Sequence, residues 1–258
     1  MKMRIKTPAK INLTLKVGKK RPDGFHPIKS IMQTISLFDF LNVEIKKGMG
    51  KITLSGSSNE IPYDENNIVH KAACAFMDEA KIKFDVNIYI EKNIPVCAGL
   101  AGGSTNAAGV LFALNKMNNN ILSASQMHKI CAKLGSDLNF CMAGSKQLCF
   151  GKGDDLTPLE FRDFKLTLIK PKNLKISTKE AYESFDKLDE ISDMPNDLEF
   201  AMLKKYPELK KLHDLGFQMS GSGPSFFTLK PYLECNLGDE YLVIENLCAI
   251  DYGVSEDK

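Results

Sequence analysis

The sequence contains no run of apolar residues long enough to cross a membrane, and its first ten residues, MKMRIKTPAK, lack the apolar segment of a secretory signal. It also carries little net charge, since 34 Lys and Arg against 32 Asp and Glu leave +2. A net charge this close to zero gives no general reason to expect nucleic acid or an anionic membrane as a partner. We therefore expect a cytoplasmic protein that binds neither.

Paired cysteine motifs and metal-ligand spacings are missing as well. The seven cysteines are odd in number and none forms C-x-x-C, while Cys74 and Cys149 stand among apolar residues. We interpret them as free, mostly buried thiols of a reducing compartment. The four histidines, His26, His70, His128 and His213, show no metal-ligand spacing, so the sequence leaves any metal ligands open.

Three familiar phosphate and nucleophile motifs are absent. No G-x-x-x-x-G-K-[ST] occurs, which excludes a Walker-type P-loop protein. No G-x-G-x-x-G occurs, which disfavours a dinucleotide oxidoreductase and a protein-kinase glycine loop. No G-x-S-x-G occurs, so the elbow of an α/β-hydrolase is missing.

What is present is an ordinary globular composition, 43% hydrophobic and 26% charged over 258 residues, enough for one large or two ordinary domains. Apolar patterns predict strands at residues 3–7, 11–17, 31–37, 41–46, 52–55, 86–91, 146–150, 165–170, 217–219 and 225–229, with another around 248–252. Helical spacing predicts helices at 67–80, 104–117, 123–134, 177–185, 197–205 and 207–215. Without regular βαβ alternation, this mixture predicts an α+β fold. The turn-rich residues 151–160 predict a domain boundary.

A small-residue loop that runs into a helix is the most informative segment. Residues 94–109 read IPVCAGLAGGSTNAAG, with glycines where a backbone can wrap an anion and with the hydroxyls of Ser104 and Thr105. The free N–H groups and positive dipole end of the following helix face whatever this loop holds. Successive N–H groups in such a turn bind anions, so the segment predicts a polyphosphate site.

Three segments together carry a resemblance to a known superfamily. Residues 94–109 resemble the central motif of the GHMP kinases, which include galacto-, homoserine, mevalonate and phosphomevalonate kinases. PAKINLTL at residues 8–15 resembles the N-terminal motif of that superfamily, and MSGSGPSFFTL at 219–229 resembles its C-terminal glycine loop. The motifs occur in the order of the superfamily and span nearly the whole chain.

Within the superfamily, RPDGFHPIKSIMQTISLFDFL at residues 21–41 resembles the 4-diphosphocytidyl-2-C-methyl-D-erythritol kinases, as does LGSDLNF at 134–140. The resemblance implies ATP-dependent phosphorylation of the 2-hydroxyl of that cytidine diphosphate compound in non-mevalonate isoprenoid biosynthesis, with Mg²⁺ expected. It also implies two domains, a ribosomal-protein-S5-domain-2-like domain at residues 1–153 and a ferredoxin-like domain at 154–258. The oligomeric state stays open.

By resemblance, Lys10 and Asp137 form the catalytic pair. Phosphoryl transfer to an alcohol needs an aimed hydroxyl, a group that accepts its proton, and cations that spread the charge. An Asp at the start of a short helix is favoured as the anion, and a lysine beside it supports that charge. From local chemistry alone, Asp137 reads equally as an N-cap and Lys10 as an exposed strand lysine.

The remaining site residues also follow from the resemblance. The ATP phosphates are expected on Pro95, Val96, Cys97, Ala98, Gly99, Leu100, Ala101, Gly102, Gly103, Ser104 and Thr105, with Ser104 as a hydroxyl partner for phosphate or magnesium. The acceptor substrate is expected on Asn12, Phe25, His26, Gly221, Ser222 and Gly223, with Phe25 stacking on the base and His26 binding its edge. Taken alone, the DGFH segment would instead indicate a turn with a core Phe and a surface His.

The chain departs from the family pattern at several positions. Ala101 stands where another Gly is usual, Phe25 replaces a frequent Tyr, and Ser136 and Asn139 replace Ala and Pro beside Asp137. Two other functions stay open: a different small-molecule kinase, such as a homoserine or mevalonate kinase, and a non-catalytic nucleotide-binding regulator. The RPDGFH segment argues against the first, and Lys10 with Asp137 against the second.

Overall fold

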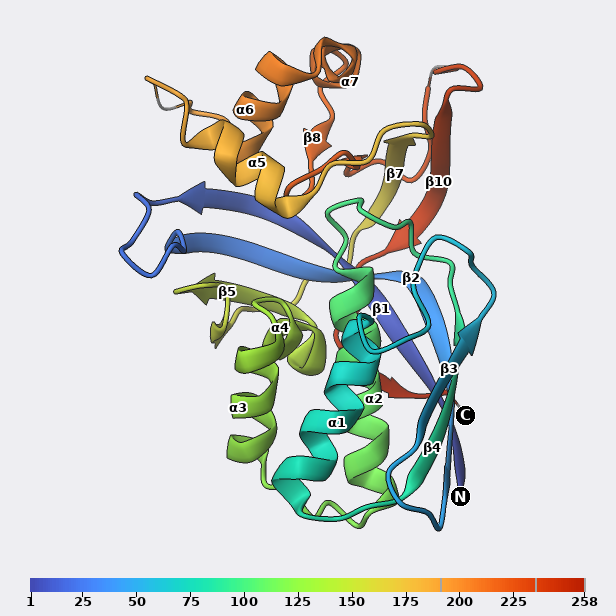
Figure 1. The fold of residues 1–258 in the computed structure, drawn as a ribbon. Helices are drawn as coiled ribbons and strands as arrows, with labels where there is room; N and C mark the ends of the chain where they lie inside the picture. The colour runs from blue at the N-terminus through green and yellow to red at the C-terminus, as the bar shows by residue number, and fades with distance from the viewer. Residues whose placement is uncertain (191, 235, 258) are drawn as a thin grey trace.

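The computed structural model describes residues 1–190, 192–234 and 236–257, which form a mixed structure with two sheets (Figure 1). In chain order the first elements are β1 (Lys2–Val17), β2 (Ile28–Lys46), β3 (Ile52–Gly56), α1 (Ile68–Ala80), β4 (Asp85–Glu91), α2 (Gly102–Met117), α3 (Ala124–Leu134), α4 (Leu138–Ala143), β5 (Lys146–Phe150) and β6 (Asp155–Pro158). They are followed by β7 (Lys165–Pro171), α5 (Thr178–Phe185), α6 (Asp197–Lys205), the 3-10 turn η1 (Pro207–Leu209), α7 (Lys210–Asp214), β8 (Gln218–Met219), β9 (Phe226–Thr228), β10 (Tyr241–Cys248) and β11 (Ser255–Glu256). The expected α+β class is confirmed.

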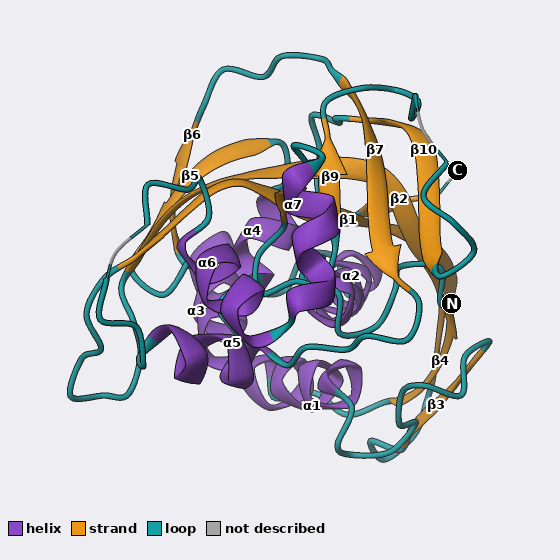
Figure 2. Cartoon of the chain, turned by 90° about the horizontal axis from the view of Figure 1, so that it is seen from above, coloured by secondary structure: helices purple, strands orange, loops and turns teal. Residues whose placement is uncertain are grey.

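The larger sheet has the strand order β11-β1-β2-β4-β3, and β5 pairs with β2 and carries β6. Helices α1 to α4 gather on one side of this sheet, where α2 packs against β1 and β2 (Figures 1 and 2). In β4 the alternate residues Val86, Ile88 and Ile90 are buried against these helices, as their spacing predicts. The main core therefore lies between this sheet and its helices.

β1 and β2 form one long antiparallel hairpin, whereas the sequence predicts two strands in each of these segments. Register shifts at Pro8/Ala9 and Asn12/Thr14 let the ladder continue past residues that interrupt the apolar pattern. The predicted break in each strand is therefore wrong. The hairpin carries its turn, residues 18–27, past α3 and α4 to the side of the molecule where α5 lies (Figure 1).

Helix boundaries follow local signals closely. Asn67 caps α1 by accepting a hydrogen bond from the Val69 N–H, and Ser123 and Gln126 form the predicted capping box of α3. α2 begins at Gly102, two residues before the predicted start. α4 is the short helix expected at Asp137, whereas β6 was not predicted, since it is short and lies among turn-forming residues.

The smaller sheet has the order β10-β7-β9-β8, with α5, α6 and α7 beside it. The strand predicted around residues 248–252 is misplaced, because β10 ends at Cys248 and the chain then crosses to the larger sheet. There Ala249 bridges Ile35, and the Gln33 side chain donates to the Ile250 carbonyl. β11 then pairs with β1.

The two sheets do not divide the chain at a single position. β6, which follows residue 154, pairs with β5, and β11 adds the last described residues to β1. The boundary expected between residues 153 and 154 therefore stays a prediction. Within the described ranges, no helix has both the length and the apolarity that a membrane crossing needs.

Candidate active site

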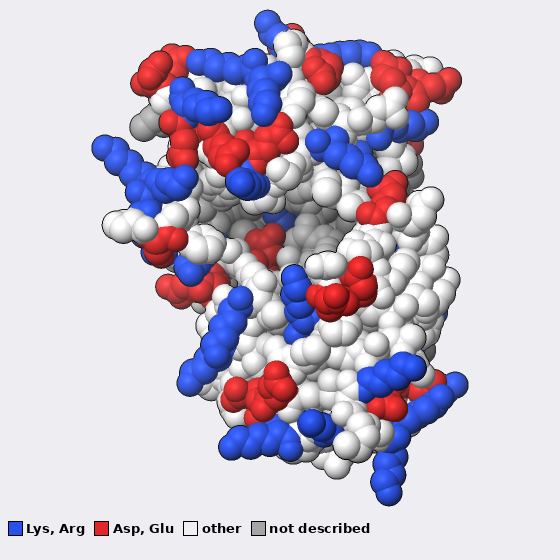
Figure 3. All heavy atoms as spheres, viewed as in Figure 1, with Lys and Arg blue, Asp and Glu red and all other residues white. Residues whose placement is uncertain are grey.

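A cavity of about 920 Å³ opens between the helices of the larger sheet and α5, and Figure 3 shows it as a hollow with acidic and basic side chains on its floor. Most of the expected site residues line it: Lys10, Asn12, Phe25, His26, Pro95, Val96, Cys97, Ala98, Gly99, Leu100, Ala101, Gly102, Gly103, Ser104, Asp137, Gly221 and Ser222. Thr105 and Gly223 do not line it. Thr105 is fully buried, and Gly223 packs against Met219.

The two glycine loops meet backbone to backbone at the cavity. Gly99 has φ 71°, and a Cβ there would lie 2.2 Å from the Ser220 carbonyl oxygen, so only glycine permits this approach. The Ser220 hydroxyl donates to the Gly99 carbonyl at 3.2 Å. Gly221 has φ 56°, and a Cβ there would lie 3.1 Å from the Lys10 Nζ. The loops thus enclose the lysine from two sides.

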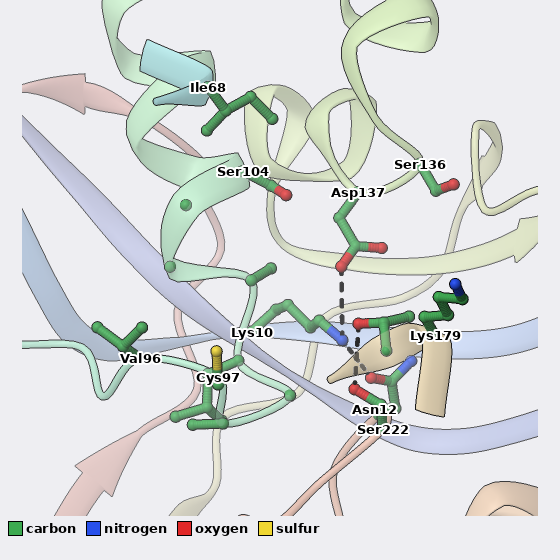
Figure 4. A pocket seen from close by; sticks show the side chains of 18 of the residues that line it. Lys10, Asn12, Ile68, Val96, Cys97, Ser104, Ser136, Asp137, Lys179 and Ser222 are labelled. Carbon is green, nitrogen blue, oxygen red and sulfur yellow. Dashed lines mark hydrogen bonds and ion pairs between the residues drawn. The ribbon is translucent and has the colours of Figure 1, made fainter. Parts of the chain in front are cut away.

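α2 starts at the cavity wall, where its first backbone N–H groups have no acceptor within the helix. Ala101 is its N-cap, and no side chain caps this end of the helix. Ala101 adopts the left-handed conformation with φ 58°, so the alanine accepts a backbone geometry that glycine takes without strain. Figure 4 shows the Ser104 hydroxyl on the same side of the cavity as Asp137. Together the helix end and Ser104 present donors to an anion.

Lys10 and Asp137 face each other across the cavity floor (Figure 4), with the lysine Nζ 3.7 Å from Asp137 Oδ2. Asp137 is the N-cap of α4, yet its side chain makes no capping hydrogen bond. The capping role that local chemistry allowed is therefore absent, and the carboxylate is directed toward the lysine. The Lys10 side chain is only 5% exposed, which strengthens its interaction with a nearby charge.

Hydrogen bonds fix Lys10 in place. Its ammonium group donates to the Asn12 side-chain oxygen, and Asn12 Nδ2 donates to the Ser30 hydroxyl at 2.7 Å. The Lys10 N–H donates to the Leu100 carbonyl at 3.2 Å, which ties β1 to the glycine loop. Lys10 and Asn12 are two residues apart on one strand, so their side chains share the cavity face.

A buried ion pair anchors the start of the glycine loop. Lys92 Nζ lies 2.6 Å from Asp39 Oδ2, and Asp39 Oδ1 accepts the N–H groups of Asn93 and Ile94. Burial lowers the pKa of Lys92, while the carboxylate beside it opposes that shift. Lys92 lines the cavity, but nothing in its sequence neighbourhood marks it, because Asp39 comes from a distant strand.

In the DGFH segment the exposures are the opposite of those that the local sequence indicates, because Phe25 is exposed and His26 is buried. The Phe25 side chain is 47% exposed at the cavity rim, and the Lys152 ammonium lies 4.2 Å from its ring centroid. His26 is 7% exposed, with its ring centroid 5.1 Å from that of Tyr182. Burial raises the pKa of Tyr182, so its hydroxyl is neutral at physiological pH. The exposed ring of Phe25 is thus followed by a buried His26 that lies against the partly buried ring of Tyr182.

Residues from the second half of the chain complete the site, and the motifs did not reveal them. Asn196 is fully buried and donates to the carbonyls of Met219 and Gly221 at 2.8 and 2.9 Å, which holds the C-terminal glycine loop. The Thr178 hydroxyl lies 3.3 Å from that of Ser222. Asn196 also caps α6, and this helix-start pattern was the one signal that could have marked it.

The described cysteines are all free thiols, and Cys131, Cys141 and Cys149 are buried, as expected. Burial raises the pKa of Cys131 and of Cys149 to about 12, so neither is a thiolate at physiological pH. Cys97 is exposed in the glycine loop, and Cys74 and Cys248 are only partly buried, so the expected burial holds for three of the six described cysteines; Cys235 lies outside the described residues. None of the buried thiols has the character of a nucleophile.

Comparison with known proteins places this geometry in context. Residues 67–145 match the model of the GHMP kinases N terminal domain. A 4-diphosphocytidyl-2-C-methyl-D-erythritol kinase of Clostridium beijerinckii is 40% identical, with 88% of this chain and 90% of the relative covered. The crystal structure of a 4-(cytidine 5'-diphospho)-2C-methyl-D-erythritol kinase superposes with a TM-score of 0.74 at 30% identity, over 88% of this chain and 90% of the other.

The fold extends to more distant proteins. A homoserine kinase from Cytophaga hutchinsonii superposes with a TM-score of 0.72 at 16% identity, over 99% of this chain and 97% of the other. At that identity the likeness concerns the fold alone. It is consistent with the GHMP kinase fold that the sequence motifs imply.

Proposed function

Because the chain belongs to the 4-diphosphocytidyl-2-C-methyl-D-erythritol kinases, a family of GHMP kinases, we propose that it transfers the γ-phosphoryl group of ATP to the 2-hydroxyl of that cytidine diphosphate compound. The observation that carries the proposal is the Lys10–Asp137 pair, 3.7 Å apart beside the glycine loop. Both parts of a phosphoryl-transfer site thus share one cavity. The reaction supplies a phosphorylated intermediate to non-mevalonate isoprenoid biosynthesis.

In this mechanism the ATP phosphates lie on the backbone N–H groups of residues 95–104 and at the start of α2. The acceptor hydroxyl enters between Asp137 and Lys10. The carboxylate accepts or orients the hydroxyl proton, and the ammonium group attracts the γ-phosphate and balances the developing charge. Burial of Lys10 makes this charge more effective than it would be in water.

The residues present fit a magnesium ion that arrives on the ATP phosphates. Among the described residues, no group of three His, Cys, Asp or Glu could hold a metal by itself. Magnesium commonly takes one or two protein oxygens and fills its other positions with phosphate and water. Ser104 and Asp137 supply such oxygens at the cavity wall. When bound, the ion neutralises phosphate charge.

The rim of the cavity supports recognition of the cytidine diphosphate group. Phe25 offers an exposed ring for stacking, and base–aromatic stacking is worth about 1–3 kcal/mol. His26 and Tyr182 line the same cavity, and Lys152 adds a positive charge beside the Phe25 ring. Neither homoserine nor mevalonate carries a base, which disfavours the other kinase functions.

The test is a comparison of turnover with Asp137→Asn. The wild-type chain, ATP and Mg²⁺ are incubated with the cytidylyl substrate, homoserine or mevalonate, and ADP is measured. We expect turnover on the cytidylyl substrate alone. Asp137→Asn should lower kcat about 10²- to 10⁴-fold while ATP binding by calorimetry persists.

Asp155→Asn is the matched control, because this carboxylate is exposed on β6 outside the cavity, and it should retain full activity. Preferred turnover of homoserine or mevalonate would contradict the substrate assignment. Nucleotide binding without any phosphoryl transfer, in wild type and Asp137→Asn alike, would instead favour a regulator.

A further inference from the structure

One edge of β1 contacts both glycine loops. The Lys10 N–H donates to the Leu100 carbonyl in the first loop, and the Asn12 N–H donates to the side-chain oxygen of Ser220 in the second, at 3.3 Å. The Gln218 side chain, just before that second loop, donates to the Asn12 carbonyl at 3.2 Å. Backbone N–H groups two residues apart on a strand point to the same edge. The strand that carries Lys10 is therefore attached to the two loops side by side.

The Ser220 hydroxyl joins three segments at one oxygen atom. It accepts the Asn12 N–H from β1 and donates to the Gly99 carbonyl at 3.2 Å, and Ser220 is fully buried. A hydroxyl has one hydrogen to donate and lone pairs that accept, while a carbonyl only accepts, so the direction of both hydrogen bonds is fixed. Ser220 therefore sets where the strand of Lys10 lies relative to the loop proposed to hold the ATP phosphates.

Two buried side chains of α6 and its N-cap hold the backbone on either side of Ser220. Asn196 donates to the carbonyls of Met219 and Gly221, at 2.8 and 2.9 Å. Glu199 is 2% exposed, and its Oε2 accepts the Met219 N–H at 3.0 Å. The peptide groups next to Ser220 thus have partners of their own, so the hydroxyl cannot move away from β1 unless these hydrogen bonds break.

This hydroxyl bridge is adjacent to the proposed reacting groups but lies outside the cavity. Gly221 and Ser222 line the cavity, whereas Ser220 does not. A Cβ at Gly221 would lie 3.1 Å from both Lys10 Nζ and Asn12 Oδ1, so the loop backbone packs closely against the ammonium group. A residue in this place affects how the reacting groups are aligned rather than how tightly either substrate binds.

On the basis of the proposed function, we propose that Ser220 is a positioning residue for phosphoryl transfer, whose hydroxyl aligns Lys10 on β1 with the nucleotide held by the loop of Gly99. Without this hydroxyl each substrate keeps the residues that bind it, but the strand and the loop lose their common anchor. A misplacement of about 1 Å costs on the order of 100-fold in rate. Loss of the hydroxyl should therefore lower kcat and change either KM only slightly.

The experiment compares the steady-state kinetics of Ser220→Ala and Ser225→Ala with ATP, Mg²⁺ and the cytidylyl substrate. Ser225 is the matched control, because it is a fully buried serine five residues away whose hydroxyl has no hydrogen-bond partner among the described residues. We expect Ser220→Ala to lower kcat about 10- to 100-fold and to change each KM less than about threefold. Ser225→Ala should keep the kcat of the wild type.

Two further variants separate the hydroxyl from the packing around it. Ser220→Thr keeps a hydroxyl on the same carbon, so it should recover most of the kcat that Ser220→Ala loses. Asn196→Ser keeps an oxygen that can cap α6, but it lacks the amide hydrogens that reach the Met219 and Gly221 carbonyls. It should loosen the loop from the other side and lower kcat with little change in KM, which tests the inference even if Ser220→Ala fails to fold.

Equal kcat values for Ser220→Ala and Ser225→Ala would overturn the inference. A loss of kcat that Ser220→Thr does not recover would also overturn it, because packing and not the hydroxyl would then be responsible. A rise in either KM as large as the fall in kcat would place Ser220 in substrate binding instead of alignment.

Failure of the proposed function gives a different result. If the wild type phosphorylates homoserine or mevalonate instead, the substrate assignment fails, and the same variants are compared on that acceptor. If the wild type transfers phosphate to no acceptor, the proposed reaction fails, and hydrogen exchange of the Asn12 amide still tests the bridge. Ser220→Ala should speed that exchange at least about tenfold relative to Ser225→Ala, whereas equal exchange in the two variants would refute the role of Ser220.

Discussion

Gly103→Ala should make the fold more stable and at the same time weaken the binding of ATP. A Cβ at Gly103 would meet only Ile68 Cγ2, at an ordinary contact distance of 3.7 Å. The residue has no left-handed φ, and it lies in the first turn of α2 with its open side toward the cavity. No packing or backbone constraint of the protein thus requires glycine here. The remaining reason is close approach of a ligand to this backbone.

The magnitudes follow from these contacts. Alanine in a helix is favoured over glycine by about 0.5–1 kcal/mol, so Gly103→Ala should raise the melting temperature by about 1–4 °C. The added methyl group occupies space where phosphate oxygens approach the first N–H groups of α2. Loss of one charge-assisted hydrogen bond costs about 1.5–3 kcal/mol, which corresponds to an increase of about 10- to 100-fold in the KM for ATP.

Steady-state kinetics at varied ATP and thermal unfolding without nucleotide measure the two effects. Gly109→Ala is the matched control in the same helix. Its Cβ would lie 2.5 Å from Thr7 Cγ2, so it should lower stability and leave the KM for ATP unchanged. If Gly103→Ala leaves the KM for ATP unchanged, the nucleotide does not lie against the start of α2 and the reasoning is refuted.

Three further substitutions test other parts of the structure. Phe25→Ala should raise the KM for the cytidylyl substrate about 10- to 100-fold, more than it lowers kcat, with an unchanged melting temperature because the ring is exposed; an unchanged KM would contradict the stacking role. Ala101→Gly should raise the free energy of unfolding by up to about 1 kcal/mol, measured by urea denaturation, because φ 58° suits glycine better; a loss of stability would contradict the strain. Asp85 accepts the N–H groups of Met49, Gly50 and Lys51, and these bonds lower its pKa from 3.8. The stability that the ionised Asp85 carboxylate contributes is therefore fully present above about pH 3.8, its unfolded-state pKa, and is lost as the pH falls through its lower folded-state pKa. The melting temperatures of wild type and Asp85→Asn should therefore converge in acid; a constant difference would contradict this account.

Local signals predicted most element types and several boundaries. The capping box at Ser123 and Gln126 placed the start of α3, and alternation placed β4. Continuity across β1 was not predictable, because the ladder with β2 carries the strand over Pro8 where the local pattern breaks. Short elements such as β6 exist only through pairing with a partner strand, which the local sequence does not encode.

For the site, too, the sequence predicted some residues and missed others. Family motifs located Lys10, Asp137 and the glycine loop, and the structure brings them to one cavity. Their precise roles in binding and catalysis remain predictions. Asn196 was marked only by its helix-start pattern, and Lys92 could not be found from sequence, because it acts through Asp39, which is distant along the chain. The local interpretation of Phe25 and His26 was reversed, because the hairpin turn packs His26 against α5 and leaves Phe25 at the rim.

The return of the last residues to the larger sheet has a practical consequence for dissecting the protein. A fragment that ends near residue 153 would leave one edge of β1 without β11 and one edge of β5 without β6. Bare strand edges recruit other chains, so such a fragment should tend to self-associate. The halves of the molecule should therefore be expressed together, and heating or denaturant should unfold them in a single shared transition.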